Sequence, residues 1–254
     1  MVALRASCVV VDEPLPTSRS LPWSAFAGAK VAMVVALLTV RYLVAIVRRR
    51  ADVPYADRLL QTFVWYVFRL ARCSLVVDGG AAFDDGALHG RAAIVMSNHA
   101  SAADIPALLG AVPGSLRMVM KQSLVALPLW GYAMRTAGFV PIDRKNHVRA
   151  LRQLAQAKRI VDEKHVHIWI APEGTRSTTG ELLPFKKGGF HLAKQLGAPI
   201  IPTYVDGAAE LIERPGACVH VRFGAPIETD GRDIDDVIDE TRAARFSHGS
   251  SGIA

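Results

Sequence analysis

The order of apolar and polar residues divides the chain into an N-terminal helical part and a longer part in which strands and helices alternate. Short runs rich in β-branched residues predict strands, and longer stretches with helical periodicity predict helices. The predicted strands cover residues 75–78, 92–97, 117–120, 138–142, 166–170, 200–205 and 218–223. The predicted helices cover residues 105–111, 124–136, 147–163, 187–196 and 233–245. Alternation of this kind predicts an α/β sheet with helices on its faces.

Two apolar stretches precede the alternating pattern, and basic residues interrupt both of them. In residues 21–47, Lys30 and Arg41 leave only ten uncharged positions between them, whereas a helix that crosses a bilayer needs about 20 apolar residues. Residues 59–77 are rich in aromatic side chains and contain two arginines, a combination typical of a membrane interface. We therefore expect a membrane-associated pair of helices that enters one leaflet.

Three arginines at 48–50 and Pro54 separate the two apolar stretches, and a basic turn is expected on the cytoplasmic side of a membrane. Two alternatives stay open: the first stretch could be a cleaved signal peptide, and the second an ordinary core helix beneath the following domain. The predicted organisation is a disordered leader over 1–20, a membrane-associated helical hairpin over 21–77, a catalytic domain over 78–245 and a disordered tail over 246–254.

The composition fits a protein that works at a membrane surface. Of 254 residues, 51% are apolar, and 30 Lys and Arg against 23 Asp and Glu give a net charge of +7. Hydrocarbon takes up apolar side chains and anionic lipid attracts basic ones, whereas binding to nucleic acid would explain only the charge. The three cysteines and eight histidines show no metal-ligand spacing, so we expect neither a metal site nor a disulfide framework.

The first candidate chemistry follows the strand predicted at 92–97. His99 and Asp104 stand five positions apart, and on a continuous helix their side chains would point about 140° apart. They can meet if His99 lies on the turn that leaves the strand and a helix begins near Asp104, a start that Pro106 supports. The carboxylate could then orient the imidazole as a general base. A surface histidine beside a helix-capping aspartate explains the spacing equally well.

Two later strands also end in charged residues. Asp143 and Arg144 follow one of them, and Glu173-Gly174-Thr175-Arg176 follows the next, while Lys187 stands just before a glycine pair and a helix N-terminus. Glycine backbone, arginine side chains and the start of a helix all suit an anion. These strand ends therefore predict a phosphate site, and an ordinary surface ion pair is the alternative for either arginine.

Taken together, these residues resemble the glycerolipid acyltransferase family, and within it the 1-acylglycerol-3-phosphate acyltransferases. The resemblance covers roughly residues 55–245, and the family's motifs occur in the family's order and spacing. They are Asn98-His99 to Asp104, Met120–Leu124 with Lys121, Ile142-Asp143-Arg144, Glu173–Ser177 and Ile200–Tyr204. The resemblance implies an α/β fold with a mixed sheet flanked by helices, preceded by the membrane-associated two-helix segment.

The resemblance also implies a reaction. A fatty acyl group would move from acyl-CoA or acyl carrier protein to the sn-2 hydroxyl of lysophosphatidic acid, giving phosphatidic acid. His99 would remove the hydroxyl proton while Asp104 orients the imidazole, and Arg144 and Arg176, supported by a lysine, would hold the acceptor phosphate. The candidate substrate-binding set is Asn98, Ser101, Lys121, Asp143, Arg144, Glu173, Gly174, Thr175, Arg176 and Lys187.

The implied partners are membrane phospholipid, the lysophospholipid and the acyl donor, with no cofactor beyond that donor and no nucleic acid. The implied location is the cytoplasmic side of the cell membrane, as a monotopic or single-span protein. Residues 124–136, with Leu127, Leu129, Trp130 and Met134, would line the acyl chain or belong to the core. The alternatives are another lysophospholipid or polar-lipid acceptor, a thioesterase or lipase without a G-x-S-x-G motif, and a basic lipid-binding module without turnover.

Overall fold

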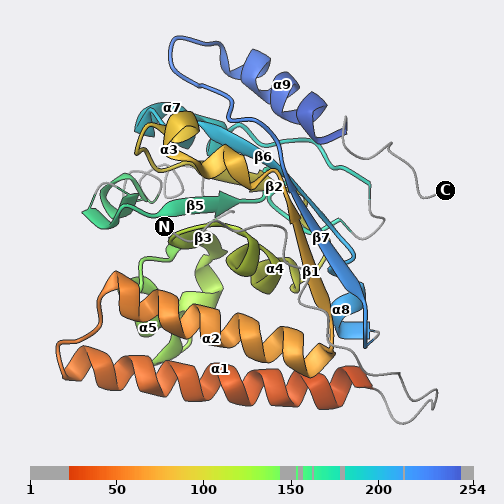
Figure 1. Ribbon diagram of the computed structural model, residues 1–254. Helices are drawn as coiled ribbons and strands as arrows, with labels where there is room; N and C mark the ends of the chain where they lie inside the picture. Colours follow the sequence, from red (N-terminus) through yellow and green to blue (C-terminus); the bar gives the residue numbers. More distant parts are fainter. Residues whose placement is uncertain are drawn as a thin grey trace. The chain divides into compact units, whose positions relative to one another are not determined.

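A computed structural model describes residues 23–143, 153, 157–161, 163–177, 181–213 and 215–246 (Figure 1). Its helices are α1 (Trp23–Val47), α2 (Val53–Ala71), α3 (Asp85–Leu88), α4 (Asp104–Ala111), α5 (Trp130–Thr136), α7 (Gly188–Leu196), α8 (Glu210–Glu213) and α9 (Ile234–Phe246), with 3-10 turns η1 (Gly80–Phe83) and η2 (Gln122–Ala126). Its strands are β1 (Ser74–Asp78), β2 (Ile94–Ser97), β3 (Leu116–Lys121), β4 (Val140–Ile142), β5 (His167–Ile170), β6 (Ile200–Asp206) and β7 (Cys218–Phe223).

The strands within the described residues are hydrogen-bonded in the order β1-β7-β6-β2-β5-β3-β4. The central strand β2 is buried along its whole length, and it runs parallel to β5 on one side and to β6 on the other, with Val95 opposite Trp169 and Ser97 opposite Thr203. Strand β3 runs parallel to β5 and β4. The predicted α/β class is confirmed, and the predicted strand bounds agree with the observed ones to within two residues.

The described chain forms two compact units. The first contains the described residues of Met1–Asp78, Ala100–Val112 and Val205–Val221, and the second those of Gly79–His99, Pro113–Tyr204 and Arg222–Ala254. The predicted domain boundaries at 20, 77 and 245 stay predictions, and residues 1–20 of the predicted leader lie outside the described part. Helix α9 extends to Phe246, so the first residue of the predicted tail is helical.

In the first unit, α1 and α2 form an antiparallel pair (Figure 1). Helix α2 begins where Asp52 caps it, because the Asp52 carboxylate accepts a hydrogen bond from the Tyr55 N–H at 2.7 Å, and Pro54 occupies the first turn. The predicted apolar stretch 59–77 misses this start, and the helix ends at Ala71. The strand predicted at 75–78, which overlaps the end of that stretch, is confirmed as β1.

Helix α2 is amphipathic, whereas α1 is apolar on nearly every side. The buried face of α2 carries Ala56, Leu59, Val64, Val67 and Ala71. Large apolar side chains of α1 are exposed instead: Met33, Leu37, Val40, Val44 and Val47. By length and composition, Gly28–Val47 could cross a membrane. The prediction that this helix enters only one leaflet stays a prediction.

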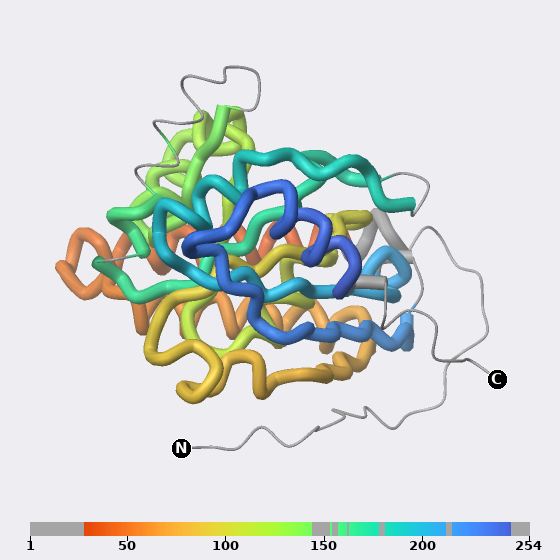
Figure 2. The backbone as a smooth tube through the Cα atoms, turned by 90° about the horizontal axis from the view of Figure 1, so that it is seen from above, coloured from red at the N-terminus to blue at the C-terminus, as the bar shows by residue number. Residues whose placement is uncertain are grey.

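In the second unit, α7 buries Phe190, Leu192 and Ala193 and packs against α9 (Figure 2). The helix predicted over 124–136 is wrong in extent, because the structure divides it into η2 and α5. Leu129 between them adopts a φ of +61°, which no α-helix allows. Of the helix predicted over 147–163, residues 153, 157–161 and 163 are helical, and residues 147–152, 154–156 and 162 lie outside the described residues.

Candidate active site

The carboxyl ends of β2 and β5 carry the predicted histidine and the predicted Glu-Gly-Thr-Arg segment. Both strands belong to the second unit and are parallel neighbours, so the loops that leave them start at the same edge of the sheet. The backbone N–H of Ser177 donates to the carbonyl oxygen of His99 at 2.8 Å. The structure therefore joins the loop that carries His99 directly to the loop that carries Arg176.

The His99 ring packs against a buried tryptophan. Its centroid lies 5.4 Å from that of Trp169, and the two planes are nearly perpendicular at 88°. Trp169 is 5% exposed, and its Nε1–H donates to the Ser97 hydroxyl at 2.8 Å. That hydroxyl donates in turn to the carbonyl of Asn98 at 2.8 Å. The indole is thus held by a hydrogen bond, and it makes an edge-to-face contact with the imidazole.

Asp104 belongs to the first unit and is the first residue of α4, with 1% of its surface exposed. Its Oδ2 accepts hydrogen bonds from the N–H groups of Ala100 at 2.9 Å and Ser101 at 3.0 Å. The predicted helix cap is wrong by one position, since Ala103 precedes the helix and its N–H donates to the Ser101 hydroxyl. The two conditions under which His99 and Asp104 can meet are fulfilled, since His99 follows β2 and the helix begins at Asp104. The interaction between the two side chains stays a prediction.

Glu173 is the buried acid of the loop after β5, with 2% of its surface exposed. Its Oε2 accepts a hydrogen bond from the Leu183 N–H at 3.1 Å, which closes the loop at its base. Its Oε1 is buried and bonds to none of the residues that the structure describes. Because a buried carboxylate oxygen without a donor is costly, this atom is suited to a donor that arrives with a ligand.

Gly174 takes a φ of +70°, which favours glycine. A Cβ at this position would lie 2.9 Å from Cδ and 3.0 Å from Nζ of Lys186, so that lysine lies across the turn. Thr175 and Arg176 are exposed at the tip. The sequence indicated Lys187 and missed Lys186, because spacing alone does not separate two adjacent lysines.

Lys187 has a different partner. Its Nζ forms an ion pair with Asp235 of α9 at 2.6 Å, and the hydrogen bond to Asp235 raises the pKa of Lys187. Lys187 is exposed and directly precedes α7. The predicted contact of Lys187 with a phosphate stays a prediction, and the structure shows an acid already in place beside this ammonium group.

Lys121 and Asp143 stand at the ends of two other parallel neighbours, β3 and β4. Lys121 is exposed, and Asp143 is half-buried with its backbone N–H donating to the Gln153 side chain at 2.7 Å. Gln153 in turn donates to Gln122 at 2.8 Å. Arg144 lies outside the described residues. Among the residues described, no group of three or more His, Cys, Asp and Glu side chains could hold a metal ion.

The amino end of β5 holds a second histidine, His167. Its Nδ1 accepts a hydrogen bond from the Ala93 N–H at 3.0 Å, and its ring packs edge-on against Phe83 at 5.3 Å. Burial lowers the pKa of His167 to about 4. The ring is therefore neutral near pH 7 and serves the sheet as a backbone acceptor.

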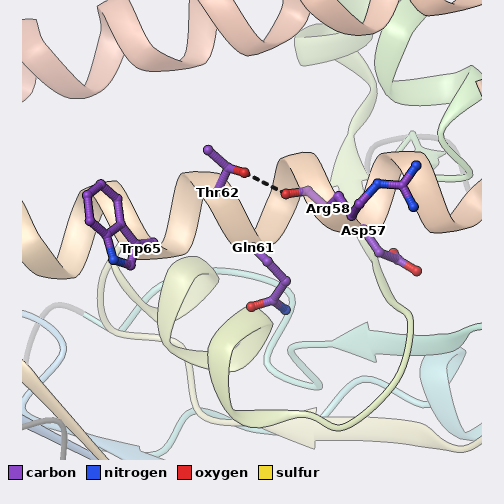
Figure 3. A pocket seen from close by; sticks show the side chains of 5 residues that line it. All are labelled: Asp57, Arg58, Gln61, Thr62 and Trp65. Atoms are coloured by element: carbon purple, nitrogen blue, oxygen red, sulfur yellow. Dashed lines mark hydrogen bonds between the residues drawn. The ribbon is translucent and has the colours of Figure 1, made fainter.

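A separate open pocket lies along α2 in the first unit (Figure 3). It is lined by Asp57, Arg58, Gln61, Thr62 and Trp65. None of these belongs to the predicted site. Two are engaged in hydrogen bonds, since Gln61 donates to the Leu109 carbonyl and Thr62 to that of Arg58.

Comparisons with known proteins agree with the motifs. Residues 83–206 match the model of the acyltransferase family. The chain is 34% identical over 151 residues to 1-acyl-sn-glycerol-3-phosphate acyltransferase alpha of Mus musculus, covering 57% of this chain and 53% of that protein. It is 37% identical over 153 residues to the 1-acyl-sn-glycerol-3-phosphate acyltransferase of Limnanthes douglasii, covering 58% and 54%. The chain thus spans about half the length of the curated relatives it matches.

The fold also has a solved counterpart. The crystal structure of the 1-acyl-sn-glycerophosphate acyltransferase PlsC from Thermotoga maritima matches with a TM-score of 0.69 and 24% identity, over 87% of this chain and 90% of that one. The likeness supports the mixed α/β sheet flanked by helices. Every predicted site residue from Asn98 to Lys187 lies within the span of residues 83–206 that matches the family model. This part of the chain therefore carries the similarity to the acyltransferase family.

Proposed function

We propose that the protein is an O-acyltransferase that moves a fatty acyl group from a thioester to the sn-2 hydroxyl of lysophosphatidic acid, giving phosphatidic acid. The relatives named above support the reaction and the acceptor. The observation that carries the proposal is the hydrogen bond from the Ser177 N–H to the His99 carbonyl. This bond joins the His99 loop to the loop that carries Arg176, which supports a site for an acceptor that has both a hydroxyl and a phosphate.

In the proposed reaction, His99 takes the proton from the acceptor hydroxyl as the hydroxyl oxygen attacks the thioester carbonyl. The tetrahedral intermediate then collapses, the carbon–sulfur bond breaks, and the departing thiolate takes the proton from the imidazolium. The acyl ester and the free thiol are the products, and no covalent enzyme intermediate forms. The ring packs against Trp169, and this contact is proposed to limit its orientations and so to lower the entropic part of the barrier.

Asp104 is proposed to hold the imidazole in the tautomer that leaves one nitrogen as the base, and to stabilise the imidazolium. One of its two backbone donors is the N–H of Ala100, the residue that follows His99 in the chain. The carboxylate is therefore held one peptide unit from the His99 backbone.

Arg176 is proposed to bind the acceptor phosphate, because its guanidinium is exposed on the loop that is joined to His99 and offers a planar fork of donors. Arg144 and Lys121 are proposed to assist from the ends of β4 and β3. Glu173 holds the loop closed through Leu183. Asn98, Ser101, Asp143, Gly174 and Thr175 complete the proposed substrate contacts, together with Lys187 if it exchanges Asp235 for phosphate.

The donor is proposed to be acyl-CoA or acyl carrier protein, and the place of work the cytoplasmic face of the cell membrane. The exposed apolar surface of α1 supports membrane attachment. Arg41 of α1 donates to the Tyr55 hydroxyl of α2 at 3.4 Å, which gives this charged side chain a partner within the helical pair.

The test is an acyl-transfer assay with the full chain in detergent or lipid nanodiscs. Oleoyl-CoA and oleoyl carrier protein are each offered with lysophosphatidic acid, glycerol 3-phosphate or lysophosphatidylcholine, and the products are separated by chromatography. We expect phosphatidic acid from lysophosphatidic acid at the highest rate. Release of free fatty acid in the presence of saturating lysophosphatidic acid would instead identify a thioesterase. Binding of lipid without turnover of either donor would identify a lipid-binding module.

A further inference from the structure

The exposed large apolar side chains in the described part of the second unit gather on η2, on α5 and on the short connection between them. Leu124, Leu127, Leu129 and Tyr132 are 43%, 53%, 65% and 58% exposed. All large apolar residues that are exposed in that part of the unit belong to this group of four, whereas their sequence neighbours Val125 and Ala133 are buried. The segment is thus amphipathic, with an outward apolar face that no described element covers.

The backbone holds this face outward. Leu129 adopts a φ of +61°, a conformation that costs energy for a residue with a branched side chain. A Cβ on Gly131 would lie only 2.1 Å from the Val125 carbonyl oxygen, so η2 and α5 touch at their backbones. The same carbonyl accepts a hydrogen bond from Arg135 at 3.1 Å. The exposed leucines therefore sit on a compact support rather than on an open loop.

The charge of this region selects the partner. No acidic residue occurs between Asp104 and Asp143 in the sequence, and the exposed Lys121 and Arg135 precede and follow the four apolar residues in the chain. Leucine and tyrosine with flanking cations and no acids suit the boundary between acyl chains and anionic headgroups. A second copy of the same surface would bring like charges together, which argues against self-association.

We propose that residues 121–135 form a lipid-contacting surface on the second unit that inserts Leu127 and Leu129 into the headgroup region of an anionic membrane. This surface is distinct from α1, which belongs to the first unit. It concerns binding to lipid alone, so it stands or falls separately from the proposed acyl transfer.

The first test places an environment-sensitive fluorophore on a Leu129→Cys variant of the full chain, with Cys8, Cys73 and Cys218 changed to serine. A matched control carries the fluorophore on an Asp236→Cys variant, because Asp236 is exposed on α9. On vesicles of phosphatidylcholine with phosphatidylglycerol, we expect a blue shift and a rise in emission at position 129 and no change at position 236. Emission typical of water at position 129, while the protein floats with the vesicles, would overturn the proposal.

Two further outcomes of the same experiment would also overturn it. A blue shift at position 129 caused by soluble acyl-CoA without vesicles would identify the face as a wall of the acyl-chain site. A blue shift that grows with protein concentration in the absence of lipid would identify it as a contact between copies of the chain.

The second test compares a Leu129→Asp variant with a Gln195→Asp variant. Both positions are exposed, so each change adds one negative charge without disturbing the core. We expect the affinity of the full chain for the anionic vesicles to fall about tenfold for Leu129→Asp and to change less than about twofold for Gln195→Asp. Thermal unfolding should be unaffected in both, and equal vesicle affinity for Leu129→Asp and the wild type would contradict the proposal.

Discussion

The strand pair β2–β5 carries a histidine at each end, and the two are held in opposite ways. At the amino end, the ring of His167 is itself the fixing group, because its Nδ1 accepts the Ala93 N–H and burial keeps it neutral. At the carboxyl end, the backbone carbonyl of His99 accepts a hydrogen bond from Ser177, and its ring packs against Trp169 in a perpendicular arrangement. The arrangement of His167 occupies the lone pair of its Nδ1 with a backbone N–H. The contacts of His99 with Ser177 and Trp169 involve no ring nitrogen lone pair.

The same residue type can therefore stabilise the fold at one edge of a sheet and be placed for catalysis at the other. Loops that leave the carboxyl ends of parallel strands can hold a side chain by backbone contacts. At the amino ends, a buried ring satisfies a backbone donor that would otherwise lack a partner.

The largest expected effect is on kcat, and it distinguishes His99 from His167. We expect His99→Ala to lower kcat about a thousandfold, because a positioned general base contributes roughly 10²–10⁴ to the rate. His167→Asn should retain near wild-type kcat at pH 8, since Asn can place its Oδ1 where the imidazole Nδ1 accepts. Steady-state kinetics on both variants, with melting temperatures as the check on folding, decide the matter. A His99→Ala enzyme with wild-type kcat would contradict the proposed role.

The next largest expected effect is on the free energy of unfolding, and it comes from the titration of His167. The folded pKa of His167 is about 4 and its ordinary value is 6.5, so between these values the unfolded chain binds more protons than the folded one. The contribution of neutral His167 to the free energy of unfolding is therefore fully present above pH 6.5 and is lost as the pH falls toward 4. At 1.36 kcal/mol per pKa unit, the loss is at most about 3 kcal/mol.

Denaturant unfolding between pH 4 and 8 measures this loss. We expect the difference in unfolding free energy between the wild type and His167→Asn to shrink as the pH falls, because only the wild type carries this titrating ring. A difference that stays constant over the whole range would show that His167 is not neutralised by the fold.

The smallest expected effect is on the KM for lysophosphatidic acid, and it tests the two basic residues Arg176 and Lys187. We expect Arg176→Ala to raise the KM for lysophosphatidic acid about tenfold with little change in kcat, because it removes a charge-assisted hydrogen bond to the substrate. Lys187→Ala should raise the same KM less than about threefold, since its ammonium group is paired with Asp235. A rise as large as that for Arg176→Ala would place Lys187 in the phosphate site after all.

Much of the fold follows from local pattern, and the failures share a cause. The strands were predictable because buried parallel strands are short β-branched runs. The segment 124–136 was not, because its apolar residues suit a continuous helix and only tertiary packing places Leu129 at a positive φ. The start of α2 was in principle readable, since Asp52 followed by Pro54 is a helix-start signal.

The same division holds for the candidate site. The positions of His99 and Asp104 after β2 and at the start of α4 followed from spacing and from Pro106. The contact of Trp169 with Ser97 joins residues 72 positions apart, and that of Lys187 with Asp235 joins residues 48 apart. Local periodicity cannot predict pairs so far apart in the chain. The contact of Trp169 with the site was therefore not predicted, and Lys187 was assigned to the phosphate site without its partner Asp235.

The hydrogen bond between Ser177 and His99 has a consequence for how this site tolerates mutation. It runs from main chain to main chain, so exchanging the side chain at either position leaves it intact. Alanine scanning is blind to it, and among the natural amino acids only proline at position 177 would delete the donor. The geometry that links the two loops is therefore set by the backbone, and a side chain at position 177 that is as small as serine leaves the link in place.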